Sequence, residues 1–341
     1  MGPYPVGVQT ITLDTNPDRP LTVDVWFPLA QDPGGDPYRY TFITGDFFES
    51  DSAVGASPDQ IATDGPFPLV VYSHGSGGVR FVHSDYTETI ASHGYVVAAP
   101  DHTGNTAVER FLDADDDSGT IAANRPNDVI TVINEMLNPE SSVTAGFVGA
   151  INPDQIAVTG HSFGGFTSYA VVSGFENAAG SSVADDRVDA IIPLAPAVGG
   201  REAPQLLSDE QLALVDVPAL VMVGTDDATT PVEPNVERAW ESTSSSPHYR
   251  LELIAAEHQS FTDVCDYQAA FDAGQEVSDP VRQVIDDYAL EGCSEGDMPI
   301  DRVHQLTNTF ALLFLDSVFD GGPMPSVDAV AGIEDIIYDT K

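Results

Sequence analysis

The chain has 341 residues, 42% of them hydrophobic, so it is long enough to bury a sizeable core and too apolar to be disordered as a whole. Its 54 Asp and Glu outnumber its 12 Lys and Arg, which gives a formal net charge of −42 at pH 7. This charge argues against nucleic acid or an anionic membrane surface as a partner, because both attract positive charge. No apolar run is long enough to predict a membrane-spanning helix.

The composition also suggests where the protein works. Acidic side chains in excess, with Lys341 as the single lysine, are typical of proteins kept soluble in high salt, where ions screen self-repulsion. A merely acidic extracellular protein is the alternative. The start Met1-Gly2-Pro3-Tyr4 shows no signal-peptide pattern, which fits a cytoplasmic protein or a mature secreted one.

Two cysteines help to choose between these compartments. Cys265 and Cys293 form neither a C-x-x-C nor a zinc-binding pattern. A pair with no other evident role predicts one disulfide and an oxidising compartment, with two separate buried thiols as the alternative. We therefore expect a secreted protein, and we expect it to be a monomer.

The first elements in chain order form a hairpin. Residues Val8–Leu13 and Leu21–Phe27 alternate between apolar and polar side chains, and Asn16-Pro17-Asp18 between them is a turn signal. The next segment, 29–66, is rich in Gly, Pro, Asp and Ser. Its composition predicts an irregular surface insertion.

From residue 68 onward, short apolar runs alternate with helical patterns. Runs of this kind are typical of parallel strands buried on both faces. The expected strands are Pro68–Tyr72, Tyr95–Ala99, Ile156–Thr159, Ala190–Leu194, Ala219–Val223 and Tyr249–Ile254. The expected helices are Ser84–Ser92, Pro126–Leu137, Phe163–Ser173, Glu233–Ser242 and Arg302–Phe319, and Pro126 suits a first helical turn. This alternation predicts an α/β fold with a mostly parallel central sheet flanked by helices.

No linker divides the chain, so we expect one domain over residues 1–341, closed by a C-terminal helical region at 262–341. Loop 103–124 is acidic, with Asp113, Asp115, Asp116 and Asp117. It lacks the spacing of a calcium-binding loop, so a solvated loop is the expected state. None of the eight histidines forms H-E-x-x-H, and we expect no metal and no cofactor.

The strongest chemical signal is Gly160-His161-Ser162-Phe163-Gly164, which fits G-x-S-x-G. It follows an expected strand and opens an expected helix, the setting of a nucleophile elbow. Small residues flank the serine because this turn is tight. Ser162 is therefore the candidate nucleophile, and an idle serine in a glycine-rich turn is the alternative.

A serine nucleophile needs a base, and the base needs an acid. His258 follows the last expected strand, whereas His74 and His161 look like packing residues, and His102 has no partner motif. Asp227 follows the strand Ala219–Val223, with Asp226 as its competitor. The order Ser162, Asp227, His258 is the order of the α/β-hydrolase triad.

An oxyanion hole completes this set of residues. One donor is expected to be the backbone N–H of Phe163, which follows the nucleophile. The second is expected from the glycine-rich loop after Tyr72, at the N–H of Ser76, with Gly75 as the competitor.

These motifs resemble the secreted α/β-hydrolases of the dienelactone-hydrolase-like and platelet-activating-factor-acetylhydrolase-like groups, which are related to cutinases and bacterial polyester (PET) hydrolases. The shared strings are PLVVYSHGSGG (68–78), HGYVVAAPDHTGNT (93–106), NRPNDV (124–129), IAVTGHSFGG (156–165), VDAIIPLAP (188–196) and GTDDATTP (224–231). The resemblance implies that Ser162, Asp227 and His258 form the triad. Dienelactone hydrolases use a cysteine where Ser162 stands, and cutinase-type enzymes often carry an aromatic residue where Ser76 stands.

The sequence therefore predicts a serine carboxylester hydrolase that acts through an acyl-enzyme on short-chain esters and, as an extension, polyesters. A phospholipid acetylhydrolase is the first alternative. A non-catalytic binding protein on the same scaffold is the second, because fold does not imply function.

Overall fold

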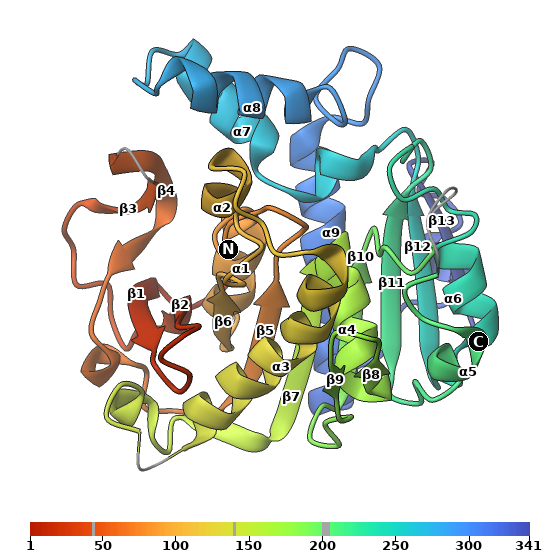
Figure 1. Cartoon of the computed structure of the whole chain (residues 1–341), viewed down its shortest axis with the longest axis horizontal. Helices are drawn as coiled ribbons and strands as arrows, with labels where there is room; N and C mark the ends of the chain where they lie inside the picture. Colours follow the sequence, from red (N-terminus) through yellow and green to blue (C-terminus); the bar gives the residue numbers. More distant parts are fainter. Residues whose placement is uncertain (43–44, 139–140, 200–204) are drawn as a thin grey trace.

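A single mixed sheet of eleven strands organises the molecule (Figure 1). The computed structural model describes residues 1–42, 45–138, 141–199 and 205–341, and its main sheet has the order β13-β12-β11-β10-β7-β5-β6-β2-β1-β4-β3. The strands are β1 (Val6–Leu13), β2 (Leu21–Pro28), β3 (Pro37–Phe42), β4 (Gly45–Gly55), β5 (Phe67–Ser73), β6 (Val96–Pro100), β7 (Ile151–His161), β10 (Ala190–Leu194), β11 (Ala219–Gly224), β12 (His248–Leu253) and β13 (Ile336–Thr340). A small second sheet pairs β8 (Phe175–Glu176) with β9 (Ser181–Ser182).

The middle of the main sheet is parallel, as the apolar runs predict. Strands β6, β5, β7, β10, β11 and β12 pair in parallel, so their carboxyl ends meet at one edge. On one flank, β2 pairs antiparallel with β6 and with β1, which confirms the N-terminal hairpin. Its turn is closed by a hydrogen bond from the Arg19 amide to the Asn16 carbonyl, 2.9 Å long.

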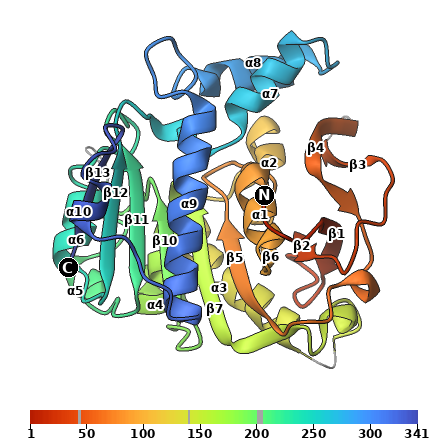
Figure 2. The ribbon, with the colours of Figure 1, turned by 180° about the vertical axis from the view of Figure 1, so that it is seen from behind.

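Helices cover both faces of the sheet. Helices α3, α4, α5 and α6 lie on the face seen in Figure 1, and α1 and α9 cross the opposite face, seen in Figure 2. The helices are α1 (Ser84–Ser92), α2 (Ala107–Phe111), α3 (Ser118–Leu137), α4 (Phe163–Ser173), α5 (Asp209–Leu212), α6 (Val236–Ser242), α7 (Val264–Asp272), α8 (Asp279–Ala289), α9 (Ile300–Phe319) and α10 (Val327–Val330). Among the described residues, the 3-10 turns are η1 (Pro58–Gln60), η2 (Ala145–Phe147) and η3 (His258–Phe261).

The core consists of two apolar layers, one on each face of the sheet. On β5, Val70 and Tyr72 join the cluster under α1 and α9, while Leu69 and Val71 join the cluster under α3 and α4. Successive side chains of a strand point to opposite faces. A strand buried on both faces must therefore be apolar at every position, which explains the continuous runs in the sequence.

Segment 29–66 differs from the predicted irregular insertion. It contains β3 and β4, which pair with each other, and β4 extends the sheet beside β1. Its polar side chains have a buried partner from elsewhere in the chain: Tyr40 and Ser50 donate to the Glu88 carboxylate at 2.6 and 2.8 Å. Because that partner lies far away in sequence, local composition does not reveal these strands.

Two further boundaries differ from the sequence-based expectation. Helix α3 begins at Ser118, so Pro126 lies inside the helix instead of in its first turn. The Asp117 side chain caps the helix by accepting hydrogen bonds from the Gly119 and Thr120 amides. The C-terminal region 262–341 is helical as far as α10 but ends in β13, which pairs antiparallel with β12.

Helices α7 and α8 project beyond the carboxyl edge of the sheet, at the top of Figure 1. A disulfide joins Cys265 in α7 to Cys293, just after α8, as predicted. Across the described part of the chain, no helix is long and apolar enough to cross a membrane.

Candidate active site

Ser162 occupies the sharp turn between β7 and α4. Its backbone has φ +58° and ψ −114°, a conformation that non-glycine residues rarely adopt. The flanking glycines permit the turn: a Cβ at Gly160 would lie 2.4 Å from the Ser73 carbonyl oxygen, and one at Gly164 only 1.8 Å from it. The backbone therefore requires glycine at both positions, as expected from the sequence.

Asp227 and His258 meet at the ends of β11 and β12. The loops after these strands pass so closely that a Cβ on Gly224 would lie 2.0 Å from the Ala256 carbonyl oxygen. His258 Nδ1 lies 2.8 Å from Asp227 Oδ2, and both residues are at least 96% buried. Asp226, the competitor, is exposed. The geometry selects Asp227 as the partner of His258.

Two threonines that the motifs did not single out hold Asp227. The Thr229 and Thr230 amides donate to Asp227 Oδ1 at 2.9 and 2.6 Å, and the Thr230 hydroxyl donates to Oδ2 at 2.9 Å. Burial alone would raise the pKa of Asp227, but the hydrogen bonds and charge of His258 and Thr230 lower it below its ordinary value. Asp227 is therefore an ionised acceptor for the imidazole. The string D-A-T-T is an Asx-turn pattern that could have signalled these contacts.

His161 packs against His258 from the other side, as expected of a packing residue. The two ring centroids are 4.5 Å apart, and His161 Nε2 lies 2.9 Å from the His258 carbonyl oxygen. Burial, reinforced by the positive potential of His258, lowers the pKa of His161 to about 3. His161 is therefore neutral, and its ring N–H donates to the His258 backbone.

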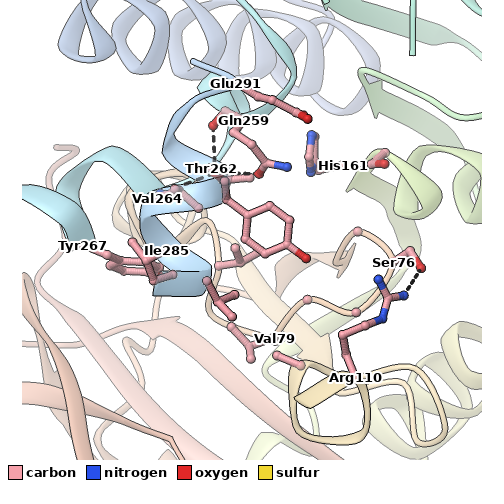
Figure 3. Close-up of a pocket in the computed structure, with 18 of the residues that line it drawn as sticks. Ser76, Val79, Arg110, His161, Gln259, Thr262, Val264, Tyr267, Ile285 and Glu291 are labelled. Atoms are coloured by element: carbon pink, nitrogen blue, oxygen red, sulfur yellow. Dashed lines mark hydrogen bonds between the residues drawn. The ribbon is translucent and has the colours of Figure 1, made fainter. Parts of the chain in front are cut away.

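Ser162 and His258 both line one cavity of about 370 Å³ (Figure 3). Its walls are mainly apolar, and the apolar side chains come from the strands β3 and β4, the loop after β5, the helix α2, and the helices α7 and α8. Figure 3 shows Tyr267 and Ile285 on one side of the cavity and Arg110 on another. The apolar wall residues include Phe42, Phe47, Val79, Phe81, Val82, Phe111, Val264, Tyr267, Val281, Val284, Ile285 and Tyr288.

The loop after β5 lies beside the serine. A Cβ on Gly75 would lie 3.4 Å from the Ser162 Cβ, and both Gly75 and Ser76 line the cavity. The Ser76 hydroxyl accepts a hydrogen bond from Arg110, 3.1 Å long. Phe163 begins α4, where backbone N–H groups are free of intrahelical partners. The two expected oxyanion donors thus belong to segments that adjoin Ser162.

The structure also shows a second Ser-His-Asp set that sequence reasoning missed. His102 Nε2 lies 2.8 Å from the Ser73 hydroxyl, and its Nδ1 lies 2.8 Å from Asp128 Oδ2. Arg19 forms an ion pair with Asp128. All three members of the set are at least 97% buried. His102 lacked a partner motif because its partners are contributed by β5 and α3.

Comparisons with known proteins show a family model, curated relatives and a solved structure to which the chain is similar. The family model described as platelet-activating factor acetylhydrolase, isoform II, matches residues 48–143. A platelet-activating factor acetylhydrolase of Bos taurus is 26% identical over 160 residues, covering 37% of this chain and 36% of the relative. A probable 1-alkyl-2-acetylglycerophosphocholine esterase of Arthroderma benhamiae is 26% identical over 278 residues, covering 74% and 61%. Chlorophyllase-1 of Arabidopsis thaliana is 29% identical over 218 residues, covering 61% of each chain.

One solved structure is similar along almost the whole chain. A ferulic acid esterase from Streptomyces cinnamoneus superposes with a TM-score of 0.73 at 22% identity, covering 98% of this chain and 96% of the other. The predicted α/β-hydrolase fold is therefore confirmed, and so is the resemblance to the acetylhydrolase-like group. This chain spans between 36% and 61% of the length of the curated relatives named above. The resemblance to cutinases and polyester hydrolases stays a prediction.

Proposed function

We propose that the protein is a serine carboxylester hydrolase, with Ser162 as nucleophile, His258 as general base and acid, and Asp227 as the carboxylate that orients His258. The observation that carries this proposal is the buried Asp227–His258 pair, 2.8 Å apart, behind a cavity that His258 and Ser162 line together. The names of the relatives and of the structural neighbour, all of them ester hydrolases, support the same reaction class.

The proposed reaction has two halves. Ser162 Oγ attacks the ester carbonyl carbon while its proton moves to His258 Nε2, and Asp227 stabilises the imidazolium. The backbone N–H groups of Phe163 and Ser76 stabilise the oxyanion. His258 then gives the proton to the leaving alcohol, which leaves an acyl group on Ser162. A water molecule then loses a proton to His258 and attacks the acyl carbon. The bond to Ser162 Oγ breaks as His258 returns the proton to that oxygen, which releases the carboxylic acid and restores both residues.

The cavity favours neutral, moderately sized esters as substrates. A space of about 370 Å³ walled by aromatic and aliphatic side chains suits a short or aromatic acyl or alcohol group. The net charge of −42 opposes the approach of anionic lipid surfaces. Short-chain esters are therefore the first substrates to test.

A phospholipid acetylhydrolase is the second candidate. Two of the relatives named above carry that activity in their names, and the matched family model covers β4 to α3. Arg110 lines the same cavity and places a cation beside it. A panel that sets short-chain nitrophenyl esters beside a short-chain 2-acetyl phospholipid and a polyester film separates the three substrate classes.

A fluorophosphonate probe tests the reaction class directly. We expect one probe per wild-type chain, located by mass spectrometry on the peptide that contains Ser162, and no label on Ser162→Ala. Label that persists in the variant would remove Ser162 from the nucleophile role. A wild-type protein that takes no label and hydrolyses none of the panel, yet binds an ester analogue in calorimetry, would support the binding-protein alternative.

We further propose that the protein works as a monomer outside the cell in a saline medium. The disulfide between Cys265 and Cys293 fits an oxidising compartment, and salt would screen the repulsion among 54 acidic residues. We expect the midpoint of thermal unfolding to hold or rise between about 0.1 M and 2 M NaCl. A fall across that range would count against the saline setting.

A further inference from the structure

A cluster of three buried side chains lies on the α1 and α9 face of the sheet, outside the catalytic set. His83 precedes α1, His304 lies on α9, and Asp263 precedes α7. One nitrogen of each histidine and one carboxylate oxygen of Asp263 lie within 4.8 Å of one another. Three segments that are far apart in the sequence therefore bring two imidazoles and a carboxylate to one point.

Over the residues that the structure describes, both ring nitrogens of His83 and one carboxylate oxygen of Asp263 lack the hydrogen-bond partners that buried polar atoms normally have. His83 is fully buried, and within the described part of the chain neither of its ring nitrogens has a hydrogen-bond partner. Asp263 is 1% exposed; its Oδ2 accepts from the Ser84 amide and hydroxyl, each at 2.5 Å, whereas its Oδ1 has no partner among the described residues. Burying polar groups without partners is costly, so such a cluster points to a ligand between them.

The charge around the cluster is negative. His304 Nδ1 lies 3.6 Å from Asp85 Oδ2 and 4.0 Å from Asp266 Oδ2, so two further carboxylates face the same ring. The side chains of Asp85 and Asp266 are 43% and 39% exposed, which gives an ion a route from solvent to His304. A divalent cation would offset this charge and complete the coordination of all three buried groups.

We propose that His83, His304 and Asp263 bind a divalent transition-metal ion of the zinc class. Two imidazoles and one carboxylate are ligands that suit zinc, whereas calcium and magnesium prefer oxygen-only sets. Bonds of roughly 2.0–2.1 Å place tetrahedral ligand atoms about 3.4 Å apart, so the ion would draw these atoms, which lie within 4.8 Å of one another, together by at most about 1.4 Å. Water or a protein oxygen supplies the fourth ligand.

Such an ion would fix the loop that carries His258. Turn η3 and Thr262 connect His258 to Asp263, and His304 Nε2 lies 3.3 Å from the Thr262 carbonyl oxygen. The Asp263 amide also donates to the Val82 carbonyl, 2.8 Å away. The site is therefore structural: it joins α1, α7 and α9 next to the proposed catalytic histidine and takes no part in the chemistry.

Metal analysis of the full chain tests the proposal. Protein produced with zinc supplied, and then dialysed, is expected to hold one zinc per chain, and cobalt is expected to give the visible absorption of a tetrahedral site. Asp263→Asn, which keeps an oxygen acceptor for Ser84, should lose both signals. His93→Gln, at an exposed histidine outside the cluster, should keep them. If Asp263→Asn does not fold, His304→Gln tests the same ligand set.

Thermal unfolding provides an independent readout. A ligand that binds the native state alone stabilises it by about 2.7 kcal/mol at 100 times its Kd, so zinc should raise the unfolding midpoint of the metal-free wild type by several degrees and leave Asp263→Asn unchanged. A wild type that binds no stoichiometric metal and gains no stability from zinc would overturn the proposal, and the three groups would then enclose water. Tetrahedral cobalt signals in both cluster variants would place the site elsewhere. Neither result depends on ester hydrolysis.

Discussion

The candidate active site and the buried network of Ser73, His102 and Asp128 each combine a serine, a histidine and an aspartate. They differ in access to solvent and in the charged groups near the histidine. In each, a histidine Nδ1 lies 2.8 Å from an aspartate oxygen: His258 from Asp227, and His102 from Asp128. Ser162 and His258 line a cavity of about 370 Å³. Ser73 and His102 are fully buried. The same three residue types thus form a candidate active site in one place and a sealed internal network in the other.

The charged neighbours of the two histidines also differ. Burial, and then the guanidinium groups of Arg125 and Arg19, lower the pKa of His102 well below its ordinary value. The protonated form of His102 is therefore disfavoured, which makes it a weak base for Ser73 and leaves it as a hydrogen-bond bridge between Ser73 and Asp128. His258 instead packs against His161, which is itself neutral. Residue types alone do not distinguish a candidate active site from a buried network; the adjoining cavity and the neighbouring charges do.

The largest expected effect comes from exchanging the two serines in turn for alanine. Ser162→Ala should lower kcat/KM for a short-chain nitrophenyl ester by roughly 10⁴- to 10⁶-fold, because a triad acts as a unit. Ser73→Ala should retain activity within about tenfold, since losing one buried hydrogen bond costs only about 1–3 kcal/mol of stability. A folded Ser73→Ala variant that is as inactive as Ser162→Ala would contradict the assignment of Ser73 to a non-catalytic network.

The two neighbouring aspartates after β11 give the next largest effect. Asp227→Asn should lower kcat by about 10²- to 10⁴-fold, because the amide no longer stabilises the imidazolium of His258. Asp226→Asn, at the exposed neighbour, should leave kcat within about twofold. Steady-state kinetics on the same ester provides the measurement, and equal losses in the two variants would contradict the assignment of Asp227.

The stability of wild type relative to Asp227→Asn should depend on pH. Because the pKa of Asp227 is lower in the folded state than its ordinary value, its ionised form stabilises the fold above about pH 4, and this contribution is lost as the pH falls through the folded pKa. Urea unfolding should therefore show a constant gap between wild type and Asp227→Asn from about pH 7 to pH 5, and a shrinking gap below about pH 4. A difference in unfolding free energy that widens in acid would mean that folding raises the pKa of Asp227 and does not lower it.

Gly164 lies where the turn of Ser162 packs against the backbone of Ser73, and a substitution there tests that contact. A Cβ at Gly164 would lie 1.8 Å from the Ser73 carbonyl oxygen, so the turn that presents Ser162 rests on the backbone of the buried network. Gly164→Ala should destabilise the fold by more than about 4 kcal/mol, since neither backbone can move away. Gly332→Ala, where nothing lies within 4 Å of the added Cβ, should change stability by less than about 1 kcal/mol.

The sequence predicts the set beside the cavity, Ser162, Asp227 and His258, far better than the fully buried set, Ser73, His102 and Asp128. Ser162 and the loops of Asp227 and His258 carry local signals: a glycine-flanked turn, and polar residues directly after apolar runs. His102 and Asp128 carry none, because their partners Ser73 and Arg19 come from other elements. Long-range partners are not encoded in local patterns, and strands β3 and β4 were missed for the same reason, since their polar residues bond to Glu88.

The smallest effect compares a buried ion pair with an exposed one. Asp128→Asn removes the charge that faces Arg19 and His102, and it should cost about 2–3 kcal/mol in urea unfolding, because the mostly buried Arg19 loses its counter-charge and buried His102 loses a carboxylate acceptor. Asp209, 65% exposed, pairs with Arg238 at 2.7 Å. Asp209→Asn should cost less than about 1 kcal/mol, because solvent already screens that pair.

Activity should behave differently from stability in the Asp128 variant. Because Asp128 lies outside the lining of the cavity, a folded Asp128→Asn protein should keep kcat within about tenfold while its unfolding midpoint falls. If kcat instead falls by about 10³-fold with the fold intact, the hydrogen bond between His102 and Ser73, and the close packing of the Ser73 backbone against the Gly164 turn, would transmit the effect to Ser162. The buried network of Ser73, His102 and Asp128 would then position the proposed nucleophile, and both regions would contribute to activity.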